Sequence, residues 1–113
     1  MSLTRDQILG SEDRKTVEVK TPEWGDGASV FVRTLTGSQR EELEAAIADQ
    51  KTDMRARFVA AFASDSDGAP LFTMADVQAI SAKSGVVLTR IVSAGLKLNS
   101  MREKDVQEFE KNS

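Results

Sequence analysis

The N-terminal third alternates apolar and polar positions as β-strands do. In residues 16–20, two valines fall on one face and charged side chains on the other. Residues 28–35 are apolar on both faces, so we expect other parts of the chain to cover both sides of this strand. Turn-forming residues fill the connection at 22–27. The pattern therefore predicts a β-hairpin.

The remaining chain has the spacing of amphipathic helices. Four Ser or Thr residues, each followed three residues later by an acidic residue or Gln, mark predicted helix starts: Thr4, Ser38, Thr73 and Ser100. The apolar stripe from Met54 to Phe62 either continues the helix that begins at Ser38 or follows a break near Thr52. In the last helix, after Ser100, the apolar side chains Val106 and Phe109 are expected to point inwards.

A helix beginning at Gly85 has the widest apolar face of the chain. One row consists of Val87, Ile91, Ala94 and Leu98, and a second row beside it consists of Leu88, Val92 and Leu96. Polar residues are confined to the narrow strip that remains, which includes Arg90, Ser93 and Lys97. Such a helix lies at the centre of a core or of an interface.

These elements predict an α+β fold: a mostly helical single domain, residues 1–113, with an N-terminal two-stranded antiparallel hairpin. We expect residues 1–14 and 111–113 to be flexible. The predicted core consists of Val17, Val19, Val30, Val32, Leu43, Ile47, Phe58, Phe62, Leu71, Phe72, Ile80, Leu88, Ile91 and Val92.

The amino-acid composition limits the classes of function that are open to the chain. The 113 residues include no Cys, His or Tyr, so thiolate, imidazole and phenol chemistry are excluded and an enzyme is not expected. A net charge of −3 argues against a nucleic-acid partner. The longest apolar run has six residues, which is far short of the roughly 20 that a membrane helix needs. We expect a cytoplasmic protein without membrane contact.

The charged motifs favour structural interpretations over catalytic, cofactor or metal sites. The run Asp65-Ser-Asp-Gly68 resembles the start of a calcium loop, but its Gly comes too early and a Glu is absent at the twelfth position. We therefore expect a solvated turn. The acidic run that begins at Glu41, and the pair Arg55 and Arg57, are expected on solvated helix faces.

Trp24 is the single Trp of a chain that is poor in aromatic residues, and it falls in a turn. It either closes the end of the domain's own core or anchors a partner, because Trp is enriched among residues that dominate binding energy. The two interpretations are compatible.

Three segments together resemble tail assembly chaperones of long-tailed bacteriophages. The first is Val17-Glu-Val-x-x-Pro22-Glu-Trp-Gly25 with Val30-x-Val-Arg33 and Leu35-Thr-Gly. The second is Asp67-Gly68-x-x-Leu71-Phe72 followed by Asp76-Val77. The third runs from Ile91 and Ala94 through Leu98-Asn99 to Glu110-Lys-Asn112. The resemblance covers about residues 15 to 112, and the Pro-Glu-Trp-Gly turn is its most distinctive part.

The resemblance implies a non-enzymatic role in the cytoplasm of the infected bacterium. Such proteins bind the tape measure protein, help to recruit tail tube protein during tail morphogenesis, and are absent from the mature virion. Acting in many copies, this chain is expected to form weak homo-oligomers. The alternative is a structural virion component such as a tail terminator or a head–tail connector.

The family has no fixed partner-binding signature, so candidate contacts rest on the chemistry of this sequence. They are Trp24, Phe31, Leu35, Leu98 and Met101. Trp24 lies in the hairpin loop, the next two on the second strand, and the last two at the junction before the final helix. The alternative is that these residues complete the core.

Overall fold

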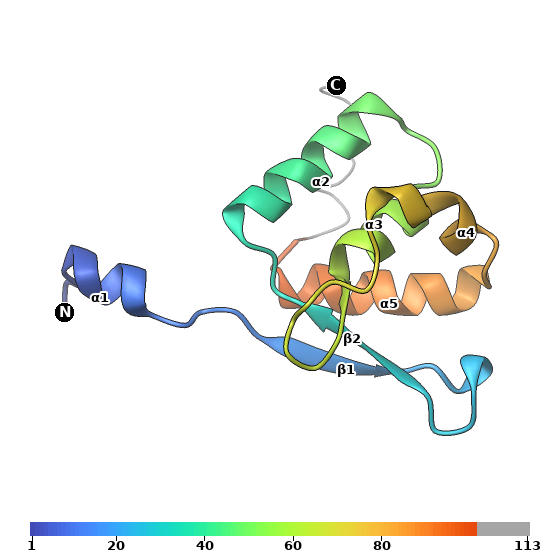
Figure 1. Ribbon diagram of the computed structural model, residues 1–113, viewed down its shortest axis with the longest axis horizontal. Helices are drawn as coiled ribbons and strands as arrows, with labels where there is room; N and C mark the ends of the chain where they lie inside the picture. The colour runs from blue at the N-terminus through green and yellow to red at the C-terminus, as the bar shows by residue number, and fades with distance from the viewer. Residues whose placement is uncertain (102–113) are drawn as a thin grey trace.

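The computed structural model describes residues 1–101. The helix predicted after Ser100, with Val106 and Phe109, lies outside the described residues. Within them the chain folds into a small sheet covered by a group of helices, and a short helix projects at the N-terminus (Figure 1). Five α-helices, three strands and two 3₁₀ turns follow in the order α1 (Arg5–Gly10), β1 (Thr16–Lys20), η1 (Pro22–Trp24), β2 (Ser29–Arg33), α2 (Gly37–Asp49), α3 (Met54–Phe62), β3 (Ala63–Ser64), η2 (Met74–Asp76), α4 (Val77–Ser81) and α5 (Gly85–Leu98).

The sheet confirms the predicted hairpin and extends it. β1 and β2 pair antiparallel from Thr16 opposite Arg33 to Lys20 opposite Ser29. The second strand ends at Arg33, two residues earlier than predicted. β3 was not predicted; it adds antiparallel to β2, with Ala63 opposite Val32. β2 is therefore the central strand, and α5 packs against both it and β1.

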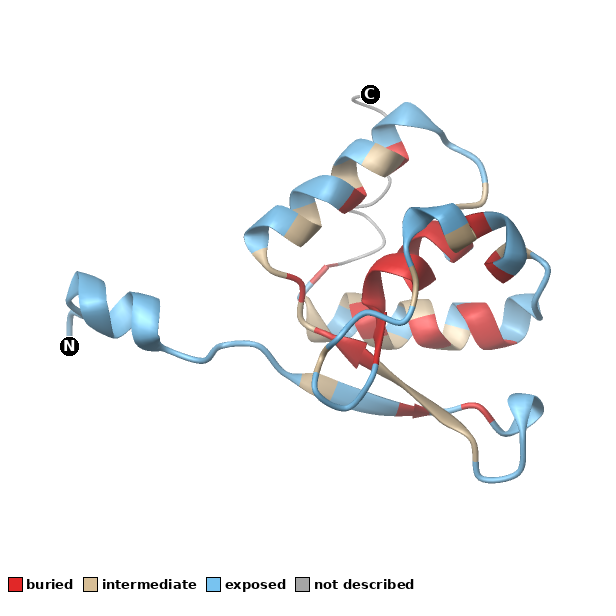
Figure 2. Cartoon of the chain, viewed as in Figure 1, coloured by how far each residue is buried: buried red, intermediate tan, exposed pale blue. Residues whose placement is uncertain are grey.

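α3 is the centre of the helical layer. Every residue from Ala56 to Phe62 is buried, and the helix contacts α2, α4, α5 and β2 (Figure 2). Its neighbour α5 runs alongside in the same direction, because the Arg55 Nε atom donates to Thr89 Oγ1 at 3.0 Å and Phe62 packs on Gly95. The break near Thr52 is confirmed, with Asp53 in the left-handed region at φ 54°.

The predicted core is largely correct. Nine of its members are buried, and three more are half-buried against them: Val30, Phe72 and Val92. Val17 and Leu71 were predicted wrongly, being 44% and 49% exposed. Neighbouring residues in extended chain point to opposite sides, so when Phe72 turns inwards Leu71 points outwards.

The position of α5 explains the exposure of Val17. The Arg90 Nη1 atom of α5 donates to the Lys20 carbonyl, so this helix lies over the far end of β1. Val19 near that end is buried, whereas Val17 lies towards the uncovered start of an edge strand.

Thr36, and not Ser38, is the N-cap residue of α2. The Gln39 amide donates to Thr36 Oγ1 at 3.1 Å, and the Thr36 amide donates back to Gln39 Oε1 at 2.9 Å. The predicted start at Ser38 was wrong because a tertiary contact fixes the chain just before Thr36: the Leu35 amide donates to Asn99 Oδ1 at 2.8 Å. The predicted caps at Thr4 and Thr73 are confirmed.

Asn99 joins the end of α5 to the end of β2. Besides accepting from Leu35, its Nδ2 atom donates to the carbonyls of Arg33 at 3.1 Å and Gly95 at 2.8 Å. One amide side chain thus satisfies three backbone groups where two elements end, which is where such groups lack partners within their own element.

Candidate partner-binding surface

The turn that carries Trp24 is held by backbone hydrogen bonds at its base. The Thr21 amide donates to the Ala28 carbonyl at 2.9 Å, and the Trp24 amide donates to the Thr21 carbonyl at 3.0 Å. Gly27 has φ 73°, a conformation that favours glycine, and allows the chain to return into β2. The sequence thus builds a closed, ordered turn.

Glu23 attaches this turn to α5. Its two carboxylate oxygens accept from Arg90 Nη1 at 2.8 Å and Nη2 at 2.7 Å, and the same Nη1 atom also donates to the Lys20 carbonyl at 3.1 Å. The hydrogen bonds from Arg90 lower the pKa of Glu23 to about 2. A two-point contact of this kind fixes orientation as well as distance, so the neighbouring Trp24 is presented at a defined position.

Trp24 stands at the edge of an open apolar hollow, which we call the Trp24 cavity. Its volume is about 380 Å³, and it is lined by Trp24, Val59, Phe72, Asp76, Ala79, Ile80 and Lys83. Trp24 is 39% exposed, and two large apolar residues nearby in the sequence of η2, Leu71 before it and Met74 at its start, are also exposed. An open apolar hollow beside an exposed indole is suited to hold an apolar side chain of a partner.

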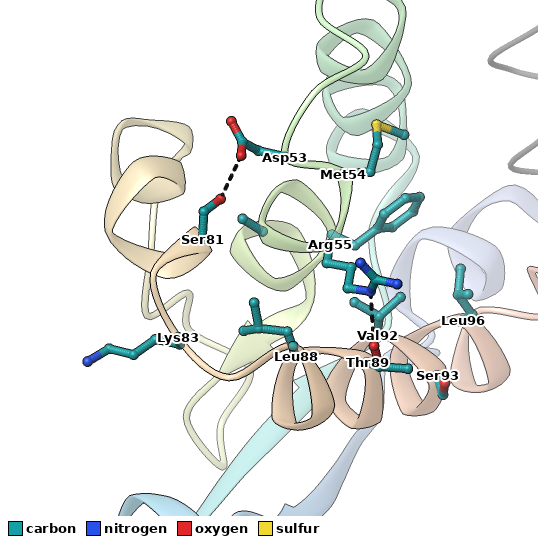
Figure 3. A pocket seen from close by; sticks show the side chains of 13 residues that line it. Asp53, Met54, Arg55, Ser81, Lys83, Leu88, Thr89, Val92, Ser93 and Leu96 are labelled. Carbon is teal, nitrogen blue, oxygen red and sulfur yellow. Dashed lines mark hydrogen bonds between the residues drawn. The ribbon is translucent and has the colours of Figure 1, made fainter.

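A second hollow, the α3–α5 groove, has a volume of about 690 Å³. Figure 3 shows Leu88, Val92 and Leu96 on α5 directed towards α3, and Arg55 reaching across to Thr89. At the upper end Asp53 accepts hydrogen bonds from the side chains of Ser81 and Gln78. The rest of the lining is Met54, Ala56, Phe58, Ser81, Lys83, Gly85 and Ser93.

Comparison with solved structures identifies the fold. The chain superimposes on the tail assembly chaperone of bacteriophage HK97 with a TM-score of 0.60, at 19% sequence identity, over 82% of this chain and 90% of the other. It has the fold of a phage tail assembly chaperone. No family model matches the sequence, and neither does any curated protein.

On this chaperone fold the five candidate contacts fall in three places. Trp24 is exposed on its turn, and Phe31 is half-buried on the central strand. Leu35 and Met101 are buried, at 8% and 3% exposure, and half-buried Leu98 lies with them where β2 and α5 end. As the structure stands, Trp24 offers the most accessible side chain of the five.

The sequence patterns did not predict that Trp24 forms a cavity together with the other residues that line it. Phe72 and Ile80 were assigned to the core, which is correct in part, and Ala79 was not singled out. Periodicity within one helix cannot show that η1 and α4, far apart in sequence, share a hollow. The usable signal was Trp24 itself, because an indole in a turn needs an apolar surface nearby.

Two arginines of this chaperone fold are structural. Arg57 was expected on a solvated face, but it is 8% exposed: its Nε atom donates to the Thr52 carbonyl at 2.8 Å, and its Nη2 atom donates to Gln50 Oε1. It thereby holds the link between α2 and α3. Arg33 donates to the carbonyls of Ala61 and Gly68, and burial lowers its pKa.

The other charged motifs lie at the surface. Glu41 and Glu42 are exposed, as predicted. The Asp65 carboxylate accepts from the amides of Asp67 and Ala69, which closes an exposed turn. Within residues 1–101 no cluster of three acidic side chains is placed to hold a metal ion. Over the same range, every helix is too short or too polar to cross a bilayer.

Proposed function

We propose that this chain is a non-enzymatic tail assembly chaperone that binds a phage tape measure protein and helps to recruit tail tube protein. The observation that carries the proposal is the shared fold with the HK97 tail assembly chaperone, which extends over most of both chains. It acts in the host cytoplasm, as weak homo-oligomers, and leaves before the virion is complete.

The Trp24 cavity supports this role physically. A long apolar partner helix must have its hydrophobic face covered during assembly, and covering must be reversible. An ordered turn exposes the indole with little further loss of conformational entropy, because Glu23 already holds it to Arg90. We propose Trp24 as the main contact, with Phe31 and Leu98 as further half-buried apolar side chains that a partner could reach.

Co-purification tests the proposal. The tagged chain is expressed with the tape measure protein and the tail tube protein of the same phage, and co-purified partner is quantified. Trp24→Ala should weaken capture by about 2 kcal/mol, which is about thirtyfold, with little change in melting temperature. Val86→Ala is the matched control, because Val86 is a 70% exposed apolar residue outside the Trp24 cavity.

The contrary outcomes are distinct. If Trp24→Ala instead costs roughly 2–5 kcal/mol of folding stability, the indole is a core residue and the contact assignment is wrong. Failure of the unmutated chain to capture either tail protein would contradict the chaperone role. Mass spectrometry of finished particles that finds the chain in several copies each would favour a virion component instead.

A further inference from the structure

β1 leaves one edge of the sheet open, because it is the first strand in the order β1–β2–β3. The Thr34 amide donates to the Lys15 carbonyl at 2.9 Å, so Lys15 directs its backbone groups towards β2. Directions alternate along an antiparallel strand. Thr16 and Glu18 therefore direct their amides and carbonyls away from β2, where these groups have no partner within residues 1–101.

The segment before β1 leads to a helix that its own domain leaves uncovered. Residues 11–15 run from β1 away from the domain to α1 (Figure 1). No residue of α1 is buried, and three apolar side chains at this end of the chain are exposed: Leu3, Ile8 and Leu9. A capping box at Thr4 nevertheless specifies the helix. An ordered helix with exposed apolar side chains is suited to contact another molecule.

We propose that the free edge of β1 pairs antiparallel with the same edge of a second copy, so that the two sheets join across a two-fold axis at Thr16. Such a contact uses the same surface on both copies and closes with two of them. The inference rests on the homo-oligomer of the proposed function and names its contact. Each arm, residues 11–15, runs along the edge of the other copy and brings the apolar side chains of α1 to it.

The charges of the strand select this register. With Thr16 opposite Thr16, Arg14 lies opposite the second copy's Glu18, and Glu12 lies opposite its Lys20. Moving the axis one residue towards the C-terminus would place Arg14 opposite Lys20, and moving it one residue the other way would place Glu12 opposite Glu18. Charged side chains usually protect an edge strand from pairing. Here they alternate in sign, and opposite charges stabilise a cross-strand pair whereas like charges destabilise it.

The ion pairs within one chain do not oppose this exchange. Arg14 contacts Glu12 at 3.3 Å and Lys20 contacts Glu18 at 3.1 Å, and each pair is exposed and only two residues apart on the strand. Exposed pairs of this kind contribute little to stability. The free edge ends at Lys20, because its carbonyl accepts from Arg90. The contact is therefore short, and a weak dimer is expected.

A mixed disulfide tests the register, because the chain contains no cysteine. On the other face of the strands, Lys15 lies opposite the second copy's Val17, with Cα atoms about 4.5 Å apart, a separation that a disulfide can bridge. Both side chains are exposed, so their replacement should leave the fold intact. Lys15→Cys and Val17→Cys chains with tags of different size are mixed in a glutathione redox buffer. The mixed dimer should form about tenfold faster than the homodimer of either variant, measured on non-reducing gels.

A charge exchange tests the same pairing without a cross-link. Arg14→Glu places a carboxylate opposite the second copy's Glu18, and should weaken the dimer about tenfold in sedimentation at low salt. Glu18→Arg should do the same, and the double variant should restore the dimer. The melting temperature of each variant, measured by circular dichroism, is the control for the fold.

Three results would overturn the proposal. Homodimers of Val17→Cys that form as fast as the mixed dimer would show a different register. A double charge variant that stays as weak as the single ones would show that Arg14 and Glu18 do not face each other. Absence of any cross-linked dimer would show that the edge does not pair. Because these experiments use the purified chain alone, their failure is distinct from a failure to capture the tail proteins.

Discussion

Gly95 lies against the ring of Phe62, which is fully buried, and adding one methyl group at position 95 should destabilise the domain. An ideal Cβ atom at position 95 would lie less than 3 Å from three ring carbons of Phe62. Phe62 has no exposed surface, and its ring packs against that of Phe58 with centroids 5.8 Å apart. The ring therefore cannot move aside without disturbing its neighbours.

The expected cost follows from two opposing effects. Overpacking a filled core typically costs about 1–3 kcal/mol, and three close ring contacts place Gly95→Ala near the upper end. Replacing Gly by Ala inside a helix returns about 1 kcal/mol of helix propensity. The net loss in the free energy of unfolding should be about 2 kcal/mol. For a chain of this length this corresponds to a melting temperature lowered by roughly 8 °C, measured by circular dichroism with urea titration at pH 7.

The control is Gly85→Ala at the start of the same helix, where an added Cβ meets nothing within 4 Å. It should be neutral or slightly stabilising. Phe62→Leu should recover part of the loss in the double variant, giving a favourable coupling energy between the two sites. A Gly95→Ala protein as stable as the wild type would refute the close packing of α5 on α3 at this point.

Two further predictions concern contacts between elements. Glu23→Gln should reduce the free energy of unfolding at pH 7, and the difference from wild type should disappear on acidification between about pH 4.5 and pH 2. The reason is that the pKa of Glu23 falls from 4.5 to about 2 on folding, so the stabilising contribution of the carboxylate is lost as it protonates. A difference that is independent of pH would contradict the pairing with Arg90. Asn99→Asp should lower the free energy of unfolding, measured by urea titration at pH 7, by about 2–3 kcal/mol, because a carboxylate would face the carbonyls of Arg33 and Gly95 in place of the donating Nδ2 atom. An unchanged urea midpoint would show that Asn99 does not join these two elements.

Local patterns predicted those parts of the fold that local physics determines. Alternation placed β1 at its observed bounds, and caps at Thr4 and Thr73 placed two helix starts. The wide apolar face placed α5 from Gly85 onwards. In each case the residues that form the element also supply the hydrogen bonds or the buried face that fix its limits, so the sequence around them is sufficient.

Long-range contacts determined the rest. Thr36 and Ser38 both match a capping pattern, and Asn99, more than 60 positions away, decides between them by holding Leu35. β3 is two residues long and exists because Phe31 and Val32 offer a free strand edge. Arg57 is buried because the Thr52 and Gln50 oxygens lie within its reach. Likewise, the sequence identified Trp24 as a candidate contact, but its cavity could be recognised only once the structure showed that η1 and α4 lie together.

The wide apolar face of α5 contributes to both the core and the surface of the domain. Its sequence left open whether so wide a face serves a core or an interface, and in the structure the face is enclosed over the first half of the helix and half-covered over the second. Val87 and Ile91, of the first row, are fully enclosed. The second row, Leu88, Val92 and Leu96, lines the α3–α5 groove, and its last two members stay half-covered. α3 packs on α5 with Phe62 against Gly95, and the half-covered side chains lie along the groove between the two helices. Where the apolar face of a helix is wider than its neighbours cover, a strip of apolar surface stays in contact with water, which is unfavourable. At this strip Val92 and Leu96 keep part of their apolar surface in contact with water.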